Sequence, residues 1–227
     1  MSIKKVQTGI PGFDSITKGG LPLNRPTLLC GNAGCGKTIF AIEFLVKGAL
    51  IYGEPGIFIT FEEPPEDLNE NISSVSMDLH SLIEKKQLCI EYIPADFESL
   101  TTTGNFNLEG LFMRLDLVIN SIQAKRISID TIEALFWSIK DKNILRTEFL
   151  RLFKWLKKKG ITTIVTAESG GNSLSRWGLE EYISDCVIFI DHRVSVQLST
   201  RRLRIIKYRG SNHGTNEYPF IIGNKGI

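Results

Sequence analysis

The chain has few cysteines and no pattern that would pair them. Four cysteines stand among its 227 residues, and none belongs to a C-x-x-C pair. Neither a zinc motif nor a disulfide framework is therefore indicated. Unpaired cysteines are typical of proteins that work in a reducing compartment, so we expect a cytoplasmic location.

Long uncharged apolar runs are missing as well. The first twelve residues lack the apolar core that a signal peptide needs. Further along the chain, no uncharged apolar run reaches the length of a membrane-spanning helix. We therefore expect no membrane partner.

Charge of one sign is not in excess. Lysine and arginine contribute 27 residues and aspartate and glutamate 25, which gives a net charge of +2. This balance gives no general reason to expect nucleic acid as a partner. Basic residues do gather late in the chain, at Arg193, Arg201, Arg202, Arg204, Lys207 and Arg209.

The most informative feature that is present is a glycine-rich segment at residues 31–38. It has the Walker A spacing Gly31-x-x-x-x-Gly36-Lys37-Thr38. The apolar run 27–30 before it predicts a buried strand, and the amphipathic run 39–46 after it predicts a helix. Backbone N–H groups of such a loop, together with the helix N-terminus, can hold phosphate. The sequence therefore predicts that ATP contacts Asn32, Ala33, Gly34, Cys35, Gly36, Lys37, Thr38 and Ile39.

Three residues of this loop invite more specific predictions. We expect Lys37 to act in catalysis by reaching the β- and γ-phosphates, and Thr38 to offer its hydroxyl to Mg²⁺. We interpret Cys35 as a small residue that fills the loop, with a redox switch as the alternative. A glycine-rich turn without a ligand is the alternative for the whole segment, and the full motif between strand and helix disfavours it.

Strands and helices alternate along most of the chain, which predicts an α/β fold with a mainly parallel sheet flanked by helices. We expect residues 94–106 to be a surface loop. After residue 186, three strands follow one another without helices and predict an antiparallel C-terminal extension. Residues 1–227 are expected to form one domain. The expected core strands are 27–30, 56–61, 88–93, 126–130 and 161–166, and the expected helices are 39–53, 65–75, 108–123 and 144–159.

Acidic residues follow two of these strands. Asp130 ends the strand 126–130 and is the candidate Walker B aspartate, which would hold Mg²⁺ through water beside Thr38. The alternative is a strand-end acid that caps the next helix. Glu62 and Glu63 follow the strand 57–61, which we expect beside the phosphate-loop strand. A carboxylate there can orient or deprotonate water, with Glu62 ranked before Glu63. A solvated acidic turn is the alternative.

These motifs resemble those of the KaiC-type ATPases, a branch of the RecA-like P-loop proteins. The resemblance covers essentially the whole chain and is most like a single N-terminal ATPase module of that family. It depends on the loop 31–38 and on the segments TGIPGFD (8–14), GGLP (19–22), FEEP (61–64), ISID (127–130), GLEEYISD (178–185), KYRGSNH (207–213) and EYPF (217–220).

The resemblance implies a hexameric ring that binds ATP and Mg²⁺ at subunit interfaces and hydrolyses ATP slowly as a timer, switch or assembly module. It implies that Ser74 contacts the nucleotide within one chain. It also implies contacts from a neighbouring chain through Lys207, Tyr208 (by its backbone), Arg209, Ser211 and His213. A solvated strand face or a nucleic-acid patch is the alternative for the basic residues, and a turn histidine for His213.

The resemblance extends to partners and to a second activity. It implies a KaiB-like protein partner, and two-module relatives include serine/threonine autokinases. A DNA-dependent ATPase of the RecA or RadA type is an alternative, but the loops 94–107 and 169–178 offer only Arg176 as a positive charge. The second alternative is an ATP-gated interaction scaffold, in which ATP binding matters and ATP hydrolysis is incidental.

Overall fold

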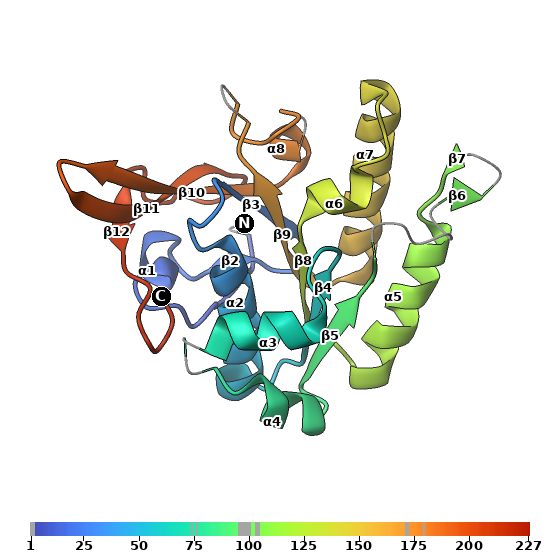
Figure 1. Ribbon diagram of the computed structural model, residues 1–227, viewed down its shortest axis with the longest axis horizontal. Helices are drawn as coiled ribbons and strands as arrows, with labels where there is room; N and C mark the ends of the chain where they lie inside the picture. Colours follow the sequence, from blue (N-terminus) through green and yellow to red (C-terminus); the bar gives the residue numbers. More distant parts are fainter. Residues whose placement is uncertain are drawn as a thin grey trace.

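One mainly parallel sheet organises the fold (Figure 1). The structure is a computed structural model that describes residues 3–73, 75, 77–94, 101–102, 105–170, 173–178 and 180–227. Within these ranges the sheet has eight strands in the order β12-β11-β10-β3-β9-β8-β4-β5. The strands are β3 (Pro26–Gly31), β4 (Gly56–Thr60), β5 (Leu88–Tyr92), β8 (Arg126–Asp130), β9 (Thr162–Glu168), β10 (Cys186–Ser195), β11 (Leu198–Tyr208) and β12 (Tyr218–Phe220).

Helices cover both faces of the sheet because each carries an apolar stripe that must be buried. On one face α1 (Phe13–Ile16), α2 (Lys37–Tyr52), α3 (Pro65–Ser73) and α4 (Leu79–Glu84) enclose one core cluster. On the other face α5 (Glu109–Ile122), α6 (Ile132–Phe136) and α7 (Lys142–Lys159) enclose a second cluster. Gly53 and Gly160, both in the left-handed region, end α2 and α7.

Small elements complete the fold. β1 (Lys5–Val6) pairs with β2 (Leu21–Pro22) at the start of the chain. α8 (Glu180–Ile183) precedes β10. β6 (Thr101–Thr102) pairs in antiparallel with β7 (Asn105–Phe106), so the segment expected to be a surface loop contains two short paired strands. None of the described helices is both long and apolar enough to cross a membrane.

The predicted fold class is confirmed, but two predictions about strand order are wrong. β4 does not lie beside the phosphate-loop strand β3, because β8 and β9, which come later in the chain, fill the space between them. β10 is not wholly antiparallel to its neighbours: it pairs in parallel with β3 and in antiparallel with β11. The antiparallel extension therefore consists of β11 and β12, and β10 belongs to the parallel core.

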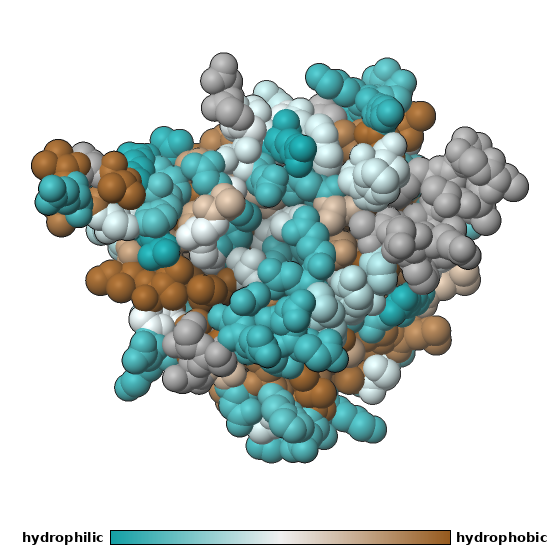
Figure 2. All heavy atoms as spheres, in the orientation of Figure 1, coloured by the Kyte–Doolittle hydropathy of each residue, from teal (hydrophilic) through white to brown (hydrophobic). Residues whose placement is uncertain are grey.

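A projecting hairpin marks one edge of the sheet. β10 and β11 continue beyond the body of the molecule and turn at its left edge in Figure 1. The turn exposes Val194, Val196 and Leu198, which are 73%, 92% and 70% exposed. Figure 2 shows apolar atoms at this tip. Exposed apolar side chains that gather at one place are typical of contact surfaces.

A buried arginine connects three elements beneath the sheet. Arg126, fully buried at the start of β8, donates hydrogen bonds to the Glu54 carboxylate (2.7 Å), the Phe44 carbonyl (3.0 Å) and the Gln7 carbonyl (2.8 Å). These bonds join the N-terminal segment, α2 and the turn that leads into β4. The contact is close, because a Cβ on Gly48 would lie 2.5 Å from the Arg126 side chain.

Removal of this guanidinium should destabilise the fold. We expect Arg126→Met to lower the free energy of unfolding by about 3 kcal/mol, because the acceptors that remain lose their donor. Urea denaturation measures this change, and Lys125→Met, an exposed neighbour, is the matched control. A loss of less than about 1 kcal/mol would show that water replaces the guanidinium at little cost.

Candidate nucleotide site

The phosphate loop joins β3 to α2 as its spacing predicts. β3 ends at Gly31 and α2 begins at Lys37. Gly34 and Gly36 have φ angles of 72° and 108°, which side chains disfavour, and Gly36 is the N-cap of α2. No side chain caps this helix, so its first N–H groups remain available to an anion.

A hollow opens directly over this loop. It has a volume of about 340 Å³, and its floor is formed by Gly34, Gly36, Lys37, Thr38 and Ile39. Arg201 from β11 and Ile222 from the segment after β12 form the opposite wall. The hollow thus combines helix-terminal amides, a lysine and an arginine, which is the chemistry that a polyphosphate requires.

Lys37 is held at the loop by two backbone carbonyls. Its side chain is buried, and Nζ donates to the carbonyls of Gly31 and Asn32 at 3.0 Å each. Asn32 is held in turn, because its side-chain oxygen accepts a hydrogen bond from the Ser169 hydroxyl after β9. Lys37 therefore needs only a local rearrangement to reach a phosphate oxygen.

Cys35 fills the inside of the loop. It is fully buried, and a Cβ on Gly31 would lie 2.6 Å from its sulfur. Burial raises the pKa of the Cys35 thiol, which keeps the thiol protonated. This environment favours the interpretation as a filler over a redox switch.

Thr38 and Asp130, 92 residues apart, meet beside the loop. The Thr38 hydroxyl donates to Asp130 Oδ2 at 2.8 Å, and the Thr166 hydroxyl donates to Asp130 Oδ1. Burial raises the pKa of Asp130, while the two hydroxyl donors and the charge of Lys37 lower it. A half-buried carboxylate beside a hydroxyl suits a hard cation, because Mg²⁺ prefers oxygen ligands.

The residues present fit Mg²⁺ held mainly by phosphate and water. No group of three or more histidine, cysteine, aspartate or glutamate side chains arranged for a metal occurs among the residues that the structure describes. Mg²⁺ in nucleotide sites commonly uses one or two protein oxygens and the substrate phosphates. Thr38 and Asp130 supply such a pair.

Glu62 and Glu63 lie in the turn after β4, and both are exposed. Glu62 Oε1 lies 3.3 Å from the Thr131 hydroxyl, next to Asp130 in the chain. Glu63 Oε2 instead accepts a long hydrogen bond of 3.4 Å from the Asn71 amide of α3. Glu62 thus contacts the residue that follows Asp130, while the charge of Glu63 also acts on Asp130 and raises its pKa, so both carboxylates lie close to the Thr38–Asp130 pair.

The basic residues assigned to a neighbouring chain lie at the other end of the sheet. In the register of β3, β10 and β11, Leu203 is level with Gly31, whereas Tyr208 is level with Thr27. Four strand residues span about 13 Å, so Tyr208 lies at least that far from its own phosphate loop. Lys207, which is level with Leu28, lies about 10 Å along the strands from Gly31, and Arg209 follows Tyr208 on the far side.

Lys207 and Arg209 form a pair of cations on one surface. Lys207 donates to the carbonyls of Glu181 (2.9 Å) and Tyr182 (3.4 Å). Arg209 lies 3.5 Å from Asp185 and donates to the Tyr182 carbonyl at 3.3 Å. Burial lowers the pKa of Lys207, and the charge of Arg209 lowers it further. Two adjacent cations favour an anionic ligand.

The other predicted contacts are arranged around Tyr208. Its side chain is buried and donates to the Gly20 carbonyl at 2.8 Å, so only its backbone is available to a ligand. The His213 ring stacks on Tyr208 with centroids 6.3 Å apart. The Ser211 hydroxyl bonds to the Asn212 carbonyl at 2.8 Å. Ser74 lies outside the residues that the structure describes.

Sequence reasoning missed four residues of this site. Arg201 and Ile222 enter the hollow from the far edge of the sheet, and no local motif indicates this position. Ser169 meets the loop because β9 is the direct neighbour of β3, and Thr166 meets Asp130 because β9 is also the direct neighbour of β8. A correct strand order would have predicted the last two, since the carboxyl ends of adjacent parallel strands share one edge.

Comparisons with known proteins agree with this geometry. The family model described as "ATPase: KaiC" matches residues 6–227. The chain belongs to the KaiC family of ATPases. Its fold and its phosphate loop are those of a KaiC ATPase domain, with the RecA-like arrangement of sheet and helices.

Curated KaiC proteins are similar over the length of the chain. It is 50% identical to "Circadian clock protein KaiC2" of Synechocystis sp., covering 100% of the chain and 40% of that protein. It is 43% identical to "Circadian clock oscillator protein KaiC" of Parathermosynechococcus lividus, covering 99% of the chain and 42% of that protein. It is 39% identical to the KaiC of Synechococcus elongatus, covering 100% of the chain and 44% of that protein. The chain therefore spans about two-fifths of the length of these relatives.

Proposed function

We propose that this KaiC domain binds ATP with Mg²⁺ at its phosphate loop and hydrolyses it slowly at the interfaces of a hexameric ring. The observation behind the proposal is the division of the site. The loop, Thr38 and Asp130 lie at one end of the sheet, and the cation pair Lys207 and Arg209 lies at the other. One chain cannot bring both ends to the same phosphate, but a head-to-tail neighbour can.

Each part of the site has a defined task in this proposal. The loop amides and Lys37 bind the phosphates, and Arg201 contacts them from the same chain. Thr38 and Asp130 would hold Mg²⁺, which supplies charge neutralisation when bound. Glu62 orients the attacking water and accepts its proton, with Glu63 in support. Lys207 and Arg209 of the neighbour stabilise the charge that develops on the γ-phosphate.

Assembly into a ring is supported by the surface of the single chain. The hairpin tip exposes three apolar side chains, Val194, Val196 and Leu198, on one edge of the molecule. Such side chains are more stable when a neighbour covers them. Tyr208, Ser211 and His213 lie beside the cation pair and would contact the base and ribose of the nucleotide across the interface.

The relatives bear names of circadian clock proteins, and we propose a similar timing or switching role here. Slow turnover would set the interval, and a KaiB-like protein is the partner that this role requires. Autokinase activity is proposed only for longer proteins with a second module, because no residue of this chain indicates a phosphorylation site.

The divided site predicts complementation between two inactive variants. Lys37→Ala removes the loop half, and Lys207→Ala with Arg209→Ala removes the neighbour half. Each variant alone should be inactive as a ring, whereas an equal mixture should recover activity at about one interface in four, because heterologous interfaces then pair intact halves at random. Steady-state phosphate release measures the recovery. Absence of any recovery in verified mixed rings would contradict the shared site.

The two alternative functions receive less support. The Arg176 guanidinium lies 3.4 Å from the Glu168 carboxylate, which offsets the one positive charge expected in the candidate DNA loops. Strong stimulation of ATPase activity by single-stranded DNA would nevertheless reverse this ranking. A scaffold would keep its output in the double variant Glu62→Gln, Glu63→Gln, whereas a timer would lose it.

A further inference from the structure

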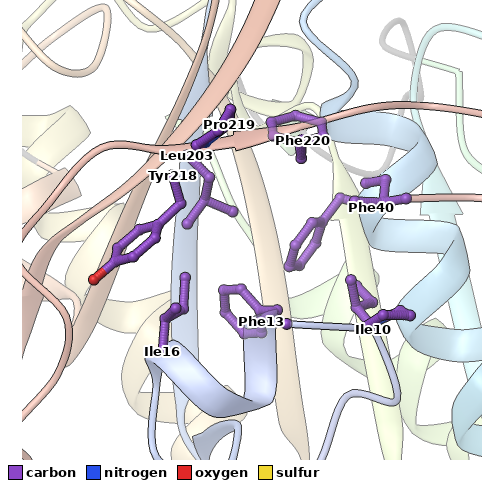
Figure 3. A pocket seen from close by; sticks show the side chains of 11 residues that line it. Ile10, Phe13, Ile16, Phe40, Leu203, Tyr218, Pro219 and Phe220 are labelled. Atoms are coloured by element: carbon purple, nitrogen blue, oxygen red, sulfur yellow. The ribbon is translucent and has the colours of Figure 1, made fainter.

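The segment after β12 is anchored at two positions. Phe220 and Ile227 line the same apolar pocket, of about 190 Å³, which lies between α1, α2 and β11. Figure 3 shows Phe220 facing Phe40 of α2 across this pocket, above Phe13. Because both anchors lie at one pocket, the intervening residues must loop outward. Ile222, within this loop, lines the nucleotide hollow.

One stripe of α2 faces this loop. Gly36, Phe40 and Glu43 are separated by four and three residues, so they lie on one side of the helix. Ile222 lies at the first of these positions, since a Cβ on Gly36 would be 2.7 Å from Ile222 Cδ1. Ile227 lies at the last of these positions, where its backbone N–H donates to the Glu43 carboxylate. The loop therefore follows α2 from the phosphate loop to Glu43, about two turns away.

Glu43 is a buried carboxylate that the catalytic proposal does not use. Its side chain is fully buried, and it accepts the backbone N–H of Ile227 at 2.7 Å. The Lys47 ammonium lies 2.5 Å from its other oxygen. The neighbouring buried positions of α2 are apolar, including Phe40 and Phe44. A buried charge is costly unless it is paired, so this carboxylate needs a structural reason.

The turn that Glu43 holds requires glycine at one position and tolerates a side chain at another. Gly223 and Gly226 exchange backbone hydrogen bonds of 2.9 and 3.1 Å. Gly226 has a φ of 100°, and a Cβ there would lie 2.5 Å from Glu43 Oε2. A Cβ on Gly223 would meet nothing within 4 Å. Glu43 therefore contacts the turn on one side only.

We infer that Glu43 is a positioning residue for the nucleotide site. It fixes Gly226 and Ile227, and this holds Ile222 against Gly36 as a wall of the hollow. The wall excludes water from the phosphate loop, which strengthens the attraction between the loop and an anion. The inference rests on the proposed nucleotide site and assigns it a residue about two turns along α2 from the phosphates.

The inference predicts that ATP binding weakens while the chemical step is spared. Glu43→Ala and Gly226→Ala should each raise the KM for ATP about tenfold, because the apolar wall of the site is lost. kcat at saturating ATP should stay within about twofold, because the residues assigned to the chemical step do not change. Glu43→Gln keeps an acceptor for the Ile227 N–H and should stay within about threefold of the original KM.

The matched control is Gly223→Ala, in the same turn, which should leave KM unchanged. Ile222→Ala should reproduce the rise in KM and should not add to that of Glu43→Ala, because both variants remove the same wall. Ile222 is only half buried, so Ile222→Ala tests the inference even if Glu43→Ala or Gly226→Ala, which change buried positions, does not fold. Amide hydrogen exchange at Ile227 should rise in Glu43→Ala and Gly226→Ala.

Two outcomes are distinguishable. In the first, the unaltered protein binds a fluorescent ATP analogue, and Glu43→Ala and Gly226→Ala exchange faster at Ile227 but keep the original KM. Glu43 then does not position the site. If the unaltered protein binds no nucleotide at all, the proposed function itself fails.

Discussion

Lys37→Ala should lower the affinity for ATP about a hundredfold, because charged hydrogen bonds to phosphate contribute ~1.5–3 kcal/mol each. Lys37 is the buried cation nearest to the amides of the phosphate loop, and its present acceptors are the carbonyls of Gly31 and Asn32. Its loss leaves Arg201, on the opposite wall of the hollow, to bind the phosphates without the lysine of the loop. Turnover should fall by at least the same factor, since Lys37 also neutralises charge on the transferred phosphate.

Titration with a fluorescent ATP analogue measures this affinity. Lys154→Ala, which removes an exposed lysine from α7, is the matched control and should bind as the original protein does. Thermal unfolding in the absence of nucleotide separates loss of binding from loss of fold. Unchanged affinity in Lys37→Ala would mean that the glycine-rich turn is not the phosphate site.

Glu62→Gln should lower kcat between about a hundredfold and a thousandfold and leave ATP affinity within about twofold. The carboxylate is exposed beside Thr131, so its replacement by an amide of the same shape changes the chemistry and not the packing. Glu63→Gln should lower kcat less than tenfold, or about 1.4 kcal/mol, because Glu63 is directed toward Asn71 of α3.

Single-turnover phosphate release with saturating ATP and Mg²⁺ separates these two variants. The comparison is internally controlled, since both changes remove one adjacent carboxylate from the same turn. If Glu63→Gln has the larger effect, the assignment of Glu62 as the base is wrong. If neither variant loses activity, another group activates the water.

The local organisation of the site could be predicted from the sequence because it depends on residues close together in the chain. The phosphate loop has a fixed spacing, and the strand before it and the helix after it have distinct periodicities. The helix-ending glycines, Gly53 and Gly160, are also local signals. Thr38 and Asp130 were expected to be neighbours because each lies at the carboxyl end of a parallel strand or just after it, and the structure brings them together.

The order of the strands could not be predicted, because a crossover helix does not reveal how many strands it passes. The connection from β3 through α2 to β4 leaves room for two strands, and β8 and β9 occupy it. For the same reason Thr166 and Ser169 were missed. Arg201 and Ile222 were missed because they meet the loop through the antiparallel edge, whose contacts depend on the strand register.

The pairing of β10 has a similar cause. Its connection from β9 contains only the four-residue helix α8 among the described residues, so the sequence offers little sign of a crossover. The parallel partner is nevertheless β3, because the first residues of β10 are almost fully apolar and suit a buried central strand. The charged residues of β11 lie on the next strand, between β10 and the edge strand β12.

The central claim is that ATP is bound and cleaved where two copies of this chain meet. The mass of the purified protein in solution, measured by analytical ultracentrifugation with and without ATP and Mg²⁺, tests it most directly. The account predicts a shift to about six times the mass of one chain when both are added. A protein that hydrolyses ATP and remains at the mass of one chain under those conditions would contradict it.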